Sequence, residues 1–452
     1  MSPVHDNTAT AGSAPPKGDA QVQVRFRTRQ SQHAVADTAI LVPAKLRRYG
    51  LSEIINHLLE SEKPIPFNFL IDGKFLQTSL SAYLEANALS TENVLDIEYV
   101  QATLPPTEAA TFEHDEWISS VEGHPVASLV LTGSYDSQAR VWDRSGTCKA
   151  VLKGHEGAVK AVAWIPLREA TGTKHRFLTG GQDHKIFGWE YTNEVAGATT
   201  RIAYECVGHT GSVDALAAHR NGLQFASASY DGSVLIWSTD PTDVEEAEPR
   251  KRRKVQGQSS TETGGIPLKV RKRCLKRRAI KRLTAHVGAV STLTYEQSSD
   301  TSAALYTGGW DHSVRIWDVE SSTNTATMNC EKVVLDMDHS ALSKLIVSGH
   351  TDNFIRLWDP RADDGLVVKL KFGSHTNWVS SVKWSPTSAY AFASCSYDST
   401  VKVWDIRSTT PLYTLSGGDA AKDEKVFAVD WVGDYIFSGG EDAQLRSFSC
   451  TV

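Results

Sequence analysis

The sequence lacks the features of a secreted or membrane-spanning protein. No run approaches the ~18 consecutive apolar residues that a membrane span requires, and residues 1–20 contain no apolar stretch like that of a secretory signal. Cysteine is also scarce, with six residues in 452 and no Cys-x-x-Cys pair, which disfavours a disulfide framework, a zinc knuckle and a redox motif. We therefore expect a cytosolic or nuclear protein with reduced cysteines and a disordered N-terminus over residues 1–20.

Positive charge is sparse over most of the chain and concentrated in one place. The formal net charge is -6, yet the stretch from Pro249 to Arg282 holds fourteen Lys or Arg residues against one acid, Glu262. This stretch therefore carries +13 and the remainder of the chain carries -19. Such a difference in composition indicates a separate module inserted into an acidic protein.

One template recurs along the chain: Ser or Thr, three residues, Asp, five residues, Trp. Successive aromatic positions are 47, 48, 80, 41, 46 and 44 residues apart, and a period of about 40–45 residues is typical of four-stranded propeller blades. Six copies match this template and a seventh has Phe448 in the place of the Trp, and together they predict a mainly β fold with a seven-bladed propeller over residues 114–452. The copies are Thr132/Asp136/Trp142, Thr179/Asp183/Trp189, Ser227/Asp231/Trp237, Thr307/Asp311/Trp317, Ser348/Asp352/Trp358, Ser394/Asp398/Trp404 and Ser438/Asp442/Phe448.

The last repeat is too short to form a whole blade by itself. Only four residues follow Phe448, so we expect a strand around Thr107 to His114 to complete the seventh blade. Residues 103–113 then serve as linker and propeller-closing strand. Such closure removes the open sheet edges on which proteins otherwise aggregate.

These repeats resemble the WD-repeat family, whose blades carry a hydrogen-bonded network of His, Ser or Thr, Asp and Trp. The resemblance implies a structural role for the network, because buried polar groups need partners. His114 is a weaker candidate before the first repeat, and repeats five and seven lack an obvious His, which predicts incomplete networks there. The residues assigned to the networks are His155, Asp183 and Trp189; His209, Asp231 and Trp237; His286, Asp311 and Trp317; and His375, Asp398 and Trp404.

His, Ser and Asp together also suggest a catalytic triad or a metal site. A triad is needed once, however, whereas this constellation recurs from repeat to repeat, and repetition favours structure over catalysis. The pairs Asp183/His184 and Asp311/His312 belong to different repeats and lack a third converging ligand. We therefore predict no enzyme activity, and we interpret these pairs as solvated turn residues.

Residues 21–102 show a different pattern, similar to the α+β ubiquitin-like β-grasp. Alternating apolar residues predict a first strand from residue 21 and a last strand over residues 95–100, and the Asp72-Gly73 pair predicts a hairpin. Between them, one apolar stripe predicts a helix that Pro64 ends. The stripe consists of Leu51, Ile54, Ile55, Leu58 and Leu59. No Gly-Gly terminus follows, so we expect a docking domain.

The basic module fills the gap between the third and fourth repeats. We expect residues 239–280 to form a disordered insertion between blades three and four, because they combine dense like charge with few apolar residues. The compact run Arg250, Lys251, Arg252, Arg253 and Lys254 is a candidate nuclear import signal or nucleic-acid patch. A solvated charge run without a partner is the alternative.

The most specific family resemblance lies in residues 45–80, which read KLRRYGLSEIINHLLESEKPIPFNFLIDGKFLQTSL. With the repeats and the basic insertion, the whole chain resembles the eukaryotic WD-repeat assembly factors that partner the block-of-proliferation and Pescadillo proteins in the PeBoW complex. The related Notchless factor has a longer propeller. The resemblance implies a non-enzymatic scaffold that matures the large (60S) ribosomal subunit and its precursor rRNA, in the nucleolus and nucleoplasm, with possible rRNA contact through the insertion.

The resemblance also assigns a role to Glu92, which lies in a polar loop before the last strand of the ubiquitin-like domain. In this family and in Notchless, an acidic residue of this loop completes the metal site of midasin, a giant AAA ATPase. The expected metal is Mg²⁺ held by the partner, which prefers hard oxygen ligands, and the chain itself is expected to hold no cofactor. Asp96 and Glu98 are less suited, because they belong to the strand pairing that builds the domain.

A ubiquitin-like domain joined to WD repeats also suits a substrate receptor of a ubiquitin ligase. In that interpretation the propeller reads a peptide and the first domain contacts the ligase. The insertion with a charge of +13 distinguishes the two, because a factor working among rRNA and nuclear carriers needs it and a ligase receptor has no general need for it.

Overall fold

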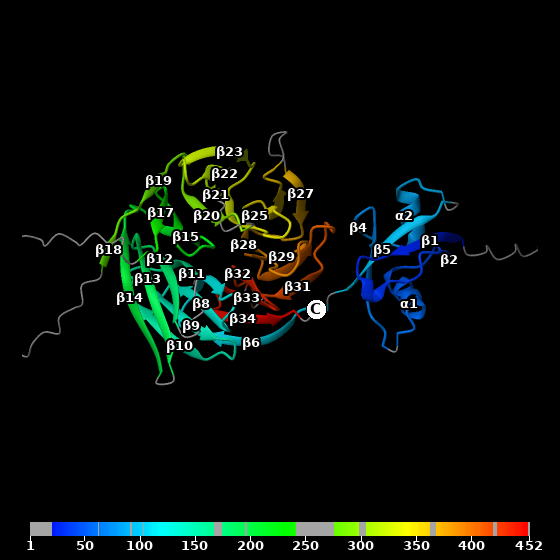
Figure 1. The fold of residues 1–452 in the computed structure, drawn as a ribbon, viewed down its shortest axis with the longest axis horizontal. Coiled ribbons are helices and arrows are strands. Elements are labelled where there is room, and N and C mark those ends of the chain that lie inside the picture. Colours follow the sequence, from blue (N-terminus) through cyan, green and yellow to red (C-terminus); the bar gives the residue numbers. More distant parts are fainter. Residues whose placement is uncertain are drawn as a thin grey trace, which may run out of the picture. The chain divides into compact units, whose positions relative to one another are not determined.

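The computed structural model describes residues 20–61, 63–90, 93–102, 104–166, 174–194, 197–240, 275–297, 304–361, 368–418 and 423–450. The chain divides into two compact units, Met1–Thr103 and Leu104–Val452. Figure 1 shows a small α+β unit and a larger ring of sheets.

The first unit is a five-stranded sheet with order β2-β1-β5-β3-β4, in which β1 and β5 run parallel. Two α-helices and a short 3-10 helix complete its described part. The elements are β1 (Gln21–Arg27), η1 (Ser31–His33), β2 (Ala39–Pro43), α1 (Arg48–Leu58), β3 (Phe67–Ile71), β4 (Lys74–Phe75), α2 (Leu80–Ala86) and β5 (Leu95–Gln101).

The core of this unit follows from the alternation along its strands. Val22, Val24 and Phe26 are buried, and they pack with Leu51 and Ile55 of α1. A two-residue turn joins β3 to β4, and both turn residues, Asp72 and Gly73, have positive φ (51° and 76°), as the predicted hairpin requires.

The predicted apolar stripe of the helix is wrong at one position, Leu58. Leu58 is 46% exposed, whereas Leu59 packs partly against the core. The reason is that α1 buries the face of Leu51, Ser52 and Ile55. Leu59 keeps helical backbone angles and continues this face, whereas Leu58 lies outside it.

The second unit contains seven sheets in its described residues, which we number as blades one to seven (Figure 1). Blade one comprises β7 (Ile118–Gly123), β8 (Leu129–Ser134), β9 (Gln138–Asp143) and β10 (Cys148–Lys153). Blade two comprises β11 (Val159–Ile165), β12 (Lys174–Gly181), β13 (Lys185–Glu194), β14 (Gly197–Val207) and β18 (Leu275–Arg277). Blade three comprises β15 (Val213–Ala218), β16 (Gln224–Ser229), β17 (Val234–Ser238) and β19 (Lys281–Leu283).

Blades four to six each consist of four consecutive strands, whereas blade seven takes its fourth strand from the start of the unit. Blade four comprises β20 (Val290–Tyr295), β21 (Ala304–Gly309), β22 (Ser313–Asp318) and β23 (Thr323–Asn329). Blade five comprises β24 (Val334–His339), β25 (Ile346–His350), β26 (Phe354–Trp358) and β27 (Val368–Gly373). Blade six comprises β28 (Val379–Trp384), β29 (Ala391–Ser396), β30 (Thr400–Asp405) and β31 (Tyr413–Ser416). Blade seven comprises β32 (Val426–Val432), β33 (Tyr435–Gly440), β34 (Gln444–Ser449) and β6 (Thr107–Glu113).

Blade seven combines strands from both ends of the second unit. Strand β6 pairs antiparallel with β34, with Phe112 opposite Leu445. The first strand of the unit is therefore the outer strand of its last blade, and the ring closes by backbone hydrogen bonds. This pairing joins residues more than 300 positions apart, as the Ser447 Oγ bond to the Ala110 carbonyl illustrates.

The basic insertion interrupts blade three between its third and fourth strands, and its returning end also adds β18 to the edge of blade two, which corrects the expectation that it separates blades three and four. The chain leaves blade three after β17 and returns as β18 and β19. The expectation was wrong because the Trp of each repeat lies in the third strand of its blade and not in the last. Strand β18 pairs in parallel with β14 of blade two, so the expected disorder is also wrong for residues 275–280. Buried Arg277 fixes this end by binding the carbonyls of Ser238 and Asp240 and by lying 3.5 Å from the centre of the Tyr204 ring.

The mainly β class predicted from the repeats is confirmed. Cys206, Cys395 and Cys450 are buried, Cys148 is exposed, and Cys274 lies outside the described residues. In the part of the chain that the structure covers, no helix has the length and apolar character needed to cross a membrane.

Candidate functional site: blade networks and the propeller channel

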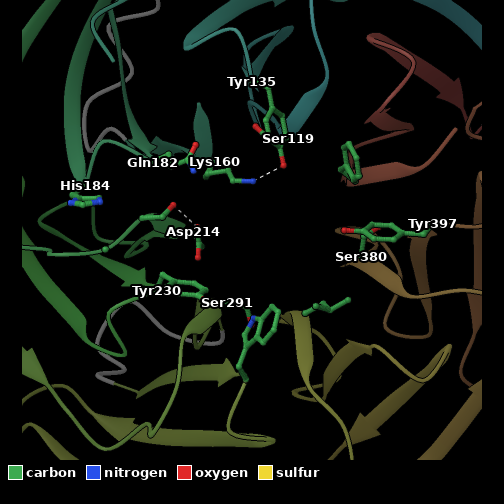
Figure 2. A pocket seen from close by; sticks show the side chains of 15 residues that line it. Ser119, Tyr135, Lys160, Gln182, His184, Asp214, Tyr230, Ser291, Ser380 and Tyr397 are labelled. Carbon is green, nitrogen blue, oxygen red and sulfur yellow. Dashed lines mark hydrogen bonds between the residues drawn. The ribbon is translucent and has the colours of Figure 1, made fainter. Parts of the chain in front are cut away.

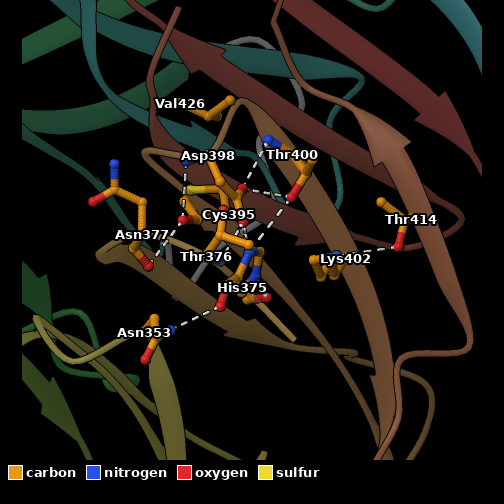
Figure 3. A network of polar contacts seen from close by, with 12 residues as sticks. Asn353, His375, Thr376, Asn377, Cys395, Asp398, Thr400, Lys402, Thr414 and Val426 are labelled. Carbon is orange, nitrogen blue, oxygen red and sulfur yellow. Dashed lines mark hydrogen bonds and ion pairs between the residues drawn. The ribbon is translucent and has the colours of Figure 1, made fainter. Parts of the chain in front are cut away.

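Four blades contain a His, hydroxyl, Asp and Trp network. In blade six (Figure 3), His375 Nδ1 lies 2.8 Å from Asp398 Oδ2, and His375 Nε2 lies 2.7 Å from Ser394 Oγ. Trp404 Nε1 donates to the same hydroxyl at 2.8 Å. Equivalent contacts join His155, Asp183, Thr179 and Trp189; His209, Asp231, Ser227 and Trp237; and His286, Asp311, Thr307 and Trp317.

The electrostatics of the networks in blades three and six favour a neutral His beside an ionised Asp. Burial lowers the pKa of His209 and of His375, which keeps both imidazoles uncharged near neutral pH. Burial opposes ionisation of Asp231, but hydrogen bonds from Ser233 and from the Thr210 backbone outweigh it and hold the pKa of Asp231 below its usual range. Each network is thus fully hydrogen-bonded and buried, which suits a structural support.

In blade one, an arginine takes the place of the His as the hydrogen-bond partner of the Asp. Arg140, which is buried, donates to Asp136 at 2.7 Å and also to the exposed Asp115 at 2.6 Å. His114 Nε2 lies 3.3 Å from the Thr132 hydroxyl, whereas its Nδ1 lies 3.4 Å from Arg140 and not beside the Asp. Burial, followed by the charge of Arg140, lowers the pKa of His114 to about 3.

Blade five contains a histidine that the sequence pattern missed. His350 Nε2 lies 2.8 Å from Ser348 Oγ, so the imidazole reaches the hydroxyl from the end of the second strand. Arg356 takes the place of the usual His on Asp352 and binds both carboxylate oxygens, at 3.0 and 2.6 Å. The sequence pattern overlooked this His, because only the usual position before the first strand was considered. The network is nevertheless incomplete, since no His–Asp contact is formed and His350 Nδ1 has no hydrogen-bond partner among the described residues.

A signal for His350 exists in the sequence. Two residues after the repeat's Ser or Thr, the other six copies have Gly or Ser. At Gly181 a Cβ atom would meet His155 Nδ1 at 2.5 Å, so a small residue leaves room for the usual His. A His in this position therefore indicates that the imidazole comes from the strand itself.

Blade seven keeps only part of the network. Phe448 occupies the Trp position and has no N–H to donate, and the buried Ser438 Oγ has no hydrogen-bond partner among the described residues. Arg446 forms an ion pair with Asp442.

The turn histidines are not placed to bind a metal. His184 and His312 are exposed and have positive φ (66° and 61°), which is typical of tight turns. Over the described residues, no group of three or more His, Cys, Asp or Glu side chains is arranged to hold a metal ion.

A ring of seven side chains surrounds the mouth of the propeller channel. In every inner strand the pairing with the second strand shifts by one residue, which leaves one extra residue in the strand. Such bulges redirect side chains, and all seven extra residues line the same opening. We call them the mouth ring: Ser119, Lys160, Asp214, Ser291, Leu335, Ser380 and Phe427.

Aromatic rings border the mouth ring on the outside. The cavity at the mouth measures about 600 Å³, and Tyr135, Tyr230, Trp310 and Tyr397 line it. Figure 2 shows Lys160 and Asp214 directed into the opening, with Tyr230 and Tyr397 at its border. Further out, Trp378 stacks on Tyr397 with a centroid distance of 5.7 Å.

Charged groups lie deeper in the channel, around a second cavity of about 180 Å³ lined by Glu122, Asp336 and Lys383. Lys383 Nζ lies 3.9 Å from Asp338 Oδ1 and retains a third of its side-chain exposure, because it borders this cavity. Although burial opposes its charge, Asp338 and then Asp430 raise the pKa of Lys383.

These carboxylates also join the inner strands of neighbouring blades. Glu122 accepts a hydrogen bond from the Trp164 backbone at 2.7 Å, and Asp338 accepts one from the Trp384 backbone at 2.9 Å. Burial, and then the Asp430 charge, raise the pKa of Glu122 to about 8. The sequence analysis missed this group, because the inner strands carry no shared acidic motif.

The predicted partner ligand Glu92 and the predicted import signal, residues 250–254, lie outside the described residues. The two less suited acids, Asp96 and Glu98, are described, and both form ion pairs with arginines. Asp96 pairs with Arg25 and Arg27 at 3.8 and 3.7 Å, and Glu98 pairs with Arg29 at 3.0 Å.

Comparisons with known proteins agree with this architecture. The NLE (NUC135) domain family matches residues 22–84, and the WD domain, G-beta repeat family matches residues 107–143, 146–190, 201–238, 277–318, 322–359 and 367–405. A ribosome biogenesis protein WDR12 homolog of Nematostella vectensis is 38% identical over 432 residues, covering 94% of this chain and 98% of the relative. Ribosome biogenesis protein ytm1 of Schizosaccharomyces pombe is 36% identical over 455 residues, covering 96% and 97%. With its NLE domain, its WD repeats and this similarity over nearly its whole length, the chain belongs to the WDR12/Ytm1 family of WD-repeat ribosome biogenesis proteins.

Proposed function

We propose that the protein is a non-enzymatic scaffold in maturation of the large ribosomal subunit and its precursor rRNA. The observation that carries this proposal is the joining of an NLE domain to WD repeats whose polar networks are buried and repeated from blade to blade. In the four blades with a complete network, the His and the hydroxyl are held in hydrogen bonds within the blade, which suits support better than attack on a substrate. Rigid blades instead provide several surfaces for partners.

The partners we propose are a block-of-proliferation family protein and a Pescadillo family protein, both bound by the propeller. The site of action is the nucleolus and nucleoplasm, with import directed by residues 250–254 and possible rRNA contact through the same insertion. The test is affinity purification of the tagged chain. Recovery of precursor large-subunit RNA with assembly factors agrees with the proposal, whereas recovery of cullin-type components without RNA favours the ubiquitin ligase receptor.

For the first unit we propose that Glu92 completes the Mg²⁺ site of midasin, so that ATP-driven pulling releases the factor from the preribosome. Support comes from the described residues on either side of position 92. Leu89 and Val94 are each 41% exposed, so the described residues on both sides of position 92 present apolar side chains at the surface that a partner can cover. Asp96 is occupied by Arg25 and Arg27 and has less freedom to coordinate a metal.

The test compares Glu92→Gln with the matched variant Asp96→Asn for binding to the isolated midasin metal site, with Mg²⁺ or with a chelator. We expect Glu92→Gln and the chelator each to abolish binding, because the open coordination position needs a carboxylate. Asp96→Asn should bind normally. Retained binding by Glu92→Gln, or binding indifferent to the chelator, would remove Glu92 from the mechanism.

A further inference from the structure

Lys160 and Asp214, the two charged residues of the mouth ring, differ in how well neighbouring groups stabilise their charges. Lys160 Nζ lies 2.5 Å from the Tyr135 hydroxyl and 4.2 Å from the centre of the Tyr135 ring, so its charge is already accommodated. Asp214 accepts a hydrogen bond from Ser212 Oγ at 2.7 Å, and Figure 2 shows its carboxylate directed into the opening. Burial raises the pKa of Asp214, although the Ser212 hydrogen bond and then the Lys160 charge oppose this shift. Its charged form would therefore gain from a cation in the mouth.

The channel below the mouth ring adds negative potential. Asp336, Asp338 and Asp430 surround a single amine, Lys383, while Glu122, with its pKa raised to about 8, is largely protonated near neutral pH and adds little charge. Mouth and channel share the seven residues of the mouth ring, so a group held at the mouth lies above this excess of carboxyl groups. A cation fits such a field, whereas an anion is repelled by it.

Exposed aromatic faces lie on the Asp214 side of the mouth. The Tyr230 backbone N–H donates to the Ser212 carbonyl at 2.9 Å, which places Tyr230 beside the strand that carries Asp214. Tyr230 is 62% exposed and Trp310 is 48% exposed, and their ring centroids are 6.5 Å apart. Large aromatic faces bind cations and anchor protein interfaces.

We propose that the channel mouth binds an arginine side chain on an extended segment of a partner protein. Its guanidinium pairs with Asp214 and stacks on Tyr230 or Trp310, while the segment lies across the outer rings. Arginine fits better than lysine, because its flat group can pair with a carboxylate and stack on a ring together. This inference rests on the scaffold role proposed above and names the chemistry of one partner segment.

The experiment uses the full chain and a labelled Gly/Ser hexapeptide with one central arginine, measured by fluorescence polarisation. Matched peptides carry citrulline, which has nearly the same shape without the charge, or glutamate. We expect the arginine peptide to bind about tenfold or more tightly than the citrulline peptide, from the combined loss of an ion pair and a cation–π contact. Asp214→Asn should remove most of this difference, and Trp310→Ala should weaken binding of the arginine peptide.

The control variant is Tyr390→Ala, which removes another exposed ring in the connection between β28 and β29, outside the mouth lining. It should bind as the unaltered chain does. Circular dichroism checks that each variant is folded. Equal binding of the arginine and citrulline peptides, a preference for glutamate, or full binding by both folded Asp214→Asn and Trp310→Ala overturns the inference. None of these outcomes bears on the ribosomal role, because the assay contains no preribosome.

Discussion

The same substitution at equivalent positions of two blades should change stability in opposite directions. In blade six, the Ser394 hydroxyl contacts both His375 and Trp404. In blade seven, the equivalent Ser438 hydroxyl is buried and has no partner among the described residues, since Phe448 cannot donate. Changing each serine to alanine therefore removes two hydrogen bonds in the first case and an unsatisfied polar group in the second.

The magnitudes follow from the groups left behind. Ser394→Ala leaves the His375 ring nitrogen and the Trp404 indole N–H buried without their partner, and each such group costs about 1–3 kcal/mol. The expected loss in the free energy of unfolding is therefore about 2–5 kcal/mol. Ser438→Ala leaves nothing unpaired and removes a hydroxyl that was costly to bury, so we expect a change between zero and a gain of about 1 kcal/mol.

Tryptophan fluorescence during thermal unfolding measures this difference cleanly. All twelve tryptophans lie in the second unit, so the signal reports on the propeller alone. At about 2 °C per kcal/mol for a large domain, Ser394→Ala should lower Tm by about 4–10 °C, while Ser438→Ala should leave Tm unchanged or slightly higher. Equal losses for the two variants, or a clear loss for Ser438→Ala, would refute the assignment of the networks as supports whose value depends on satisfied hydrogen bonds.

Three further predictions use the same readout. Deleting residues 241–274 should leave Tm within about 2 °C and shift a tagged protein towards the cytoplasm, whereas a deletion extended through Arg277 should also lower Tm because it removes the buried contacts of that side chain; a nuclear protein after the shorter deletion contradicts the import role. The raised pKa of Glu122, about 8, means that the folded state keeps a proton that the unfolded state releases above its usual pKa of 4.5, so stability should fall as pH rises through that window. Glu122→Gln, which can still accept the backbone hydrogen bond, should flatten the Tm difference between about pH 6 and about pH 8.5, and an unchanged slope speaks against the assignment. Asp352→Ala should cost about 3–5 kcal/mol because it strands the buried Arg356, and the double variant with Arg356→Met should recover much of this loss; no recovery means that the pair is not coupled.

Much of the fold was predictable because its signals are local. The hydroxyl and the Trp of each network lie ten residues apart on paired strands of one hairpin, as Ser394 and Trp404 show, so a fixed spacing in the sequence marks the contact. In the first unit, the alternation of Val22, Val24 and Phe26 and the Asp72-Gly73 turn are likewise short-range patterns.

The predictions failed where a residue outside the expected pattern supplied a contact or a boundary. Blade five replaces the expected His–Asp contact by Arg356 and takes its imidazole from His350, so a template built on one His position overlooked it. The basic insertion was assigned to the wrong boundary, because a count from Trp to Trp does not say which strand of the blade an insertion interrupts. Leu58 was assigned to the apolar stripe, but the buried face of α1 is centred on Leu51, Ser52 and Ile55 and does not include it.

By itself, the sequence determined the class of the fold, the repeated polar networks and the presence of two units. Only the tertiary structure decided which side chains meet in the channel. Lys160 and Asp214 lie 54 positions apart in different blades, and they share one opening because a bulge in each inner strand turns one side chain towards the common axis. Likewise, Glu122 and Asp430 approach each other only when β6 joins β34 and closes the ring. Contacts of this kind depend on closure of the whole propeller, and no local spacing in the sequence records them.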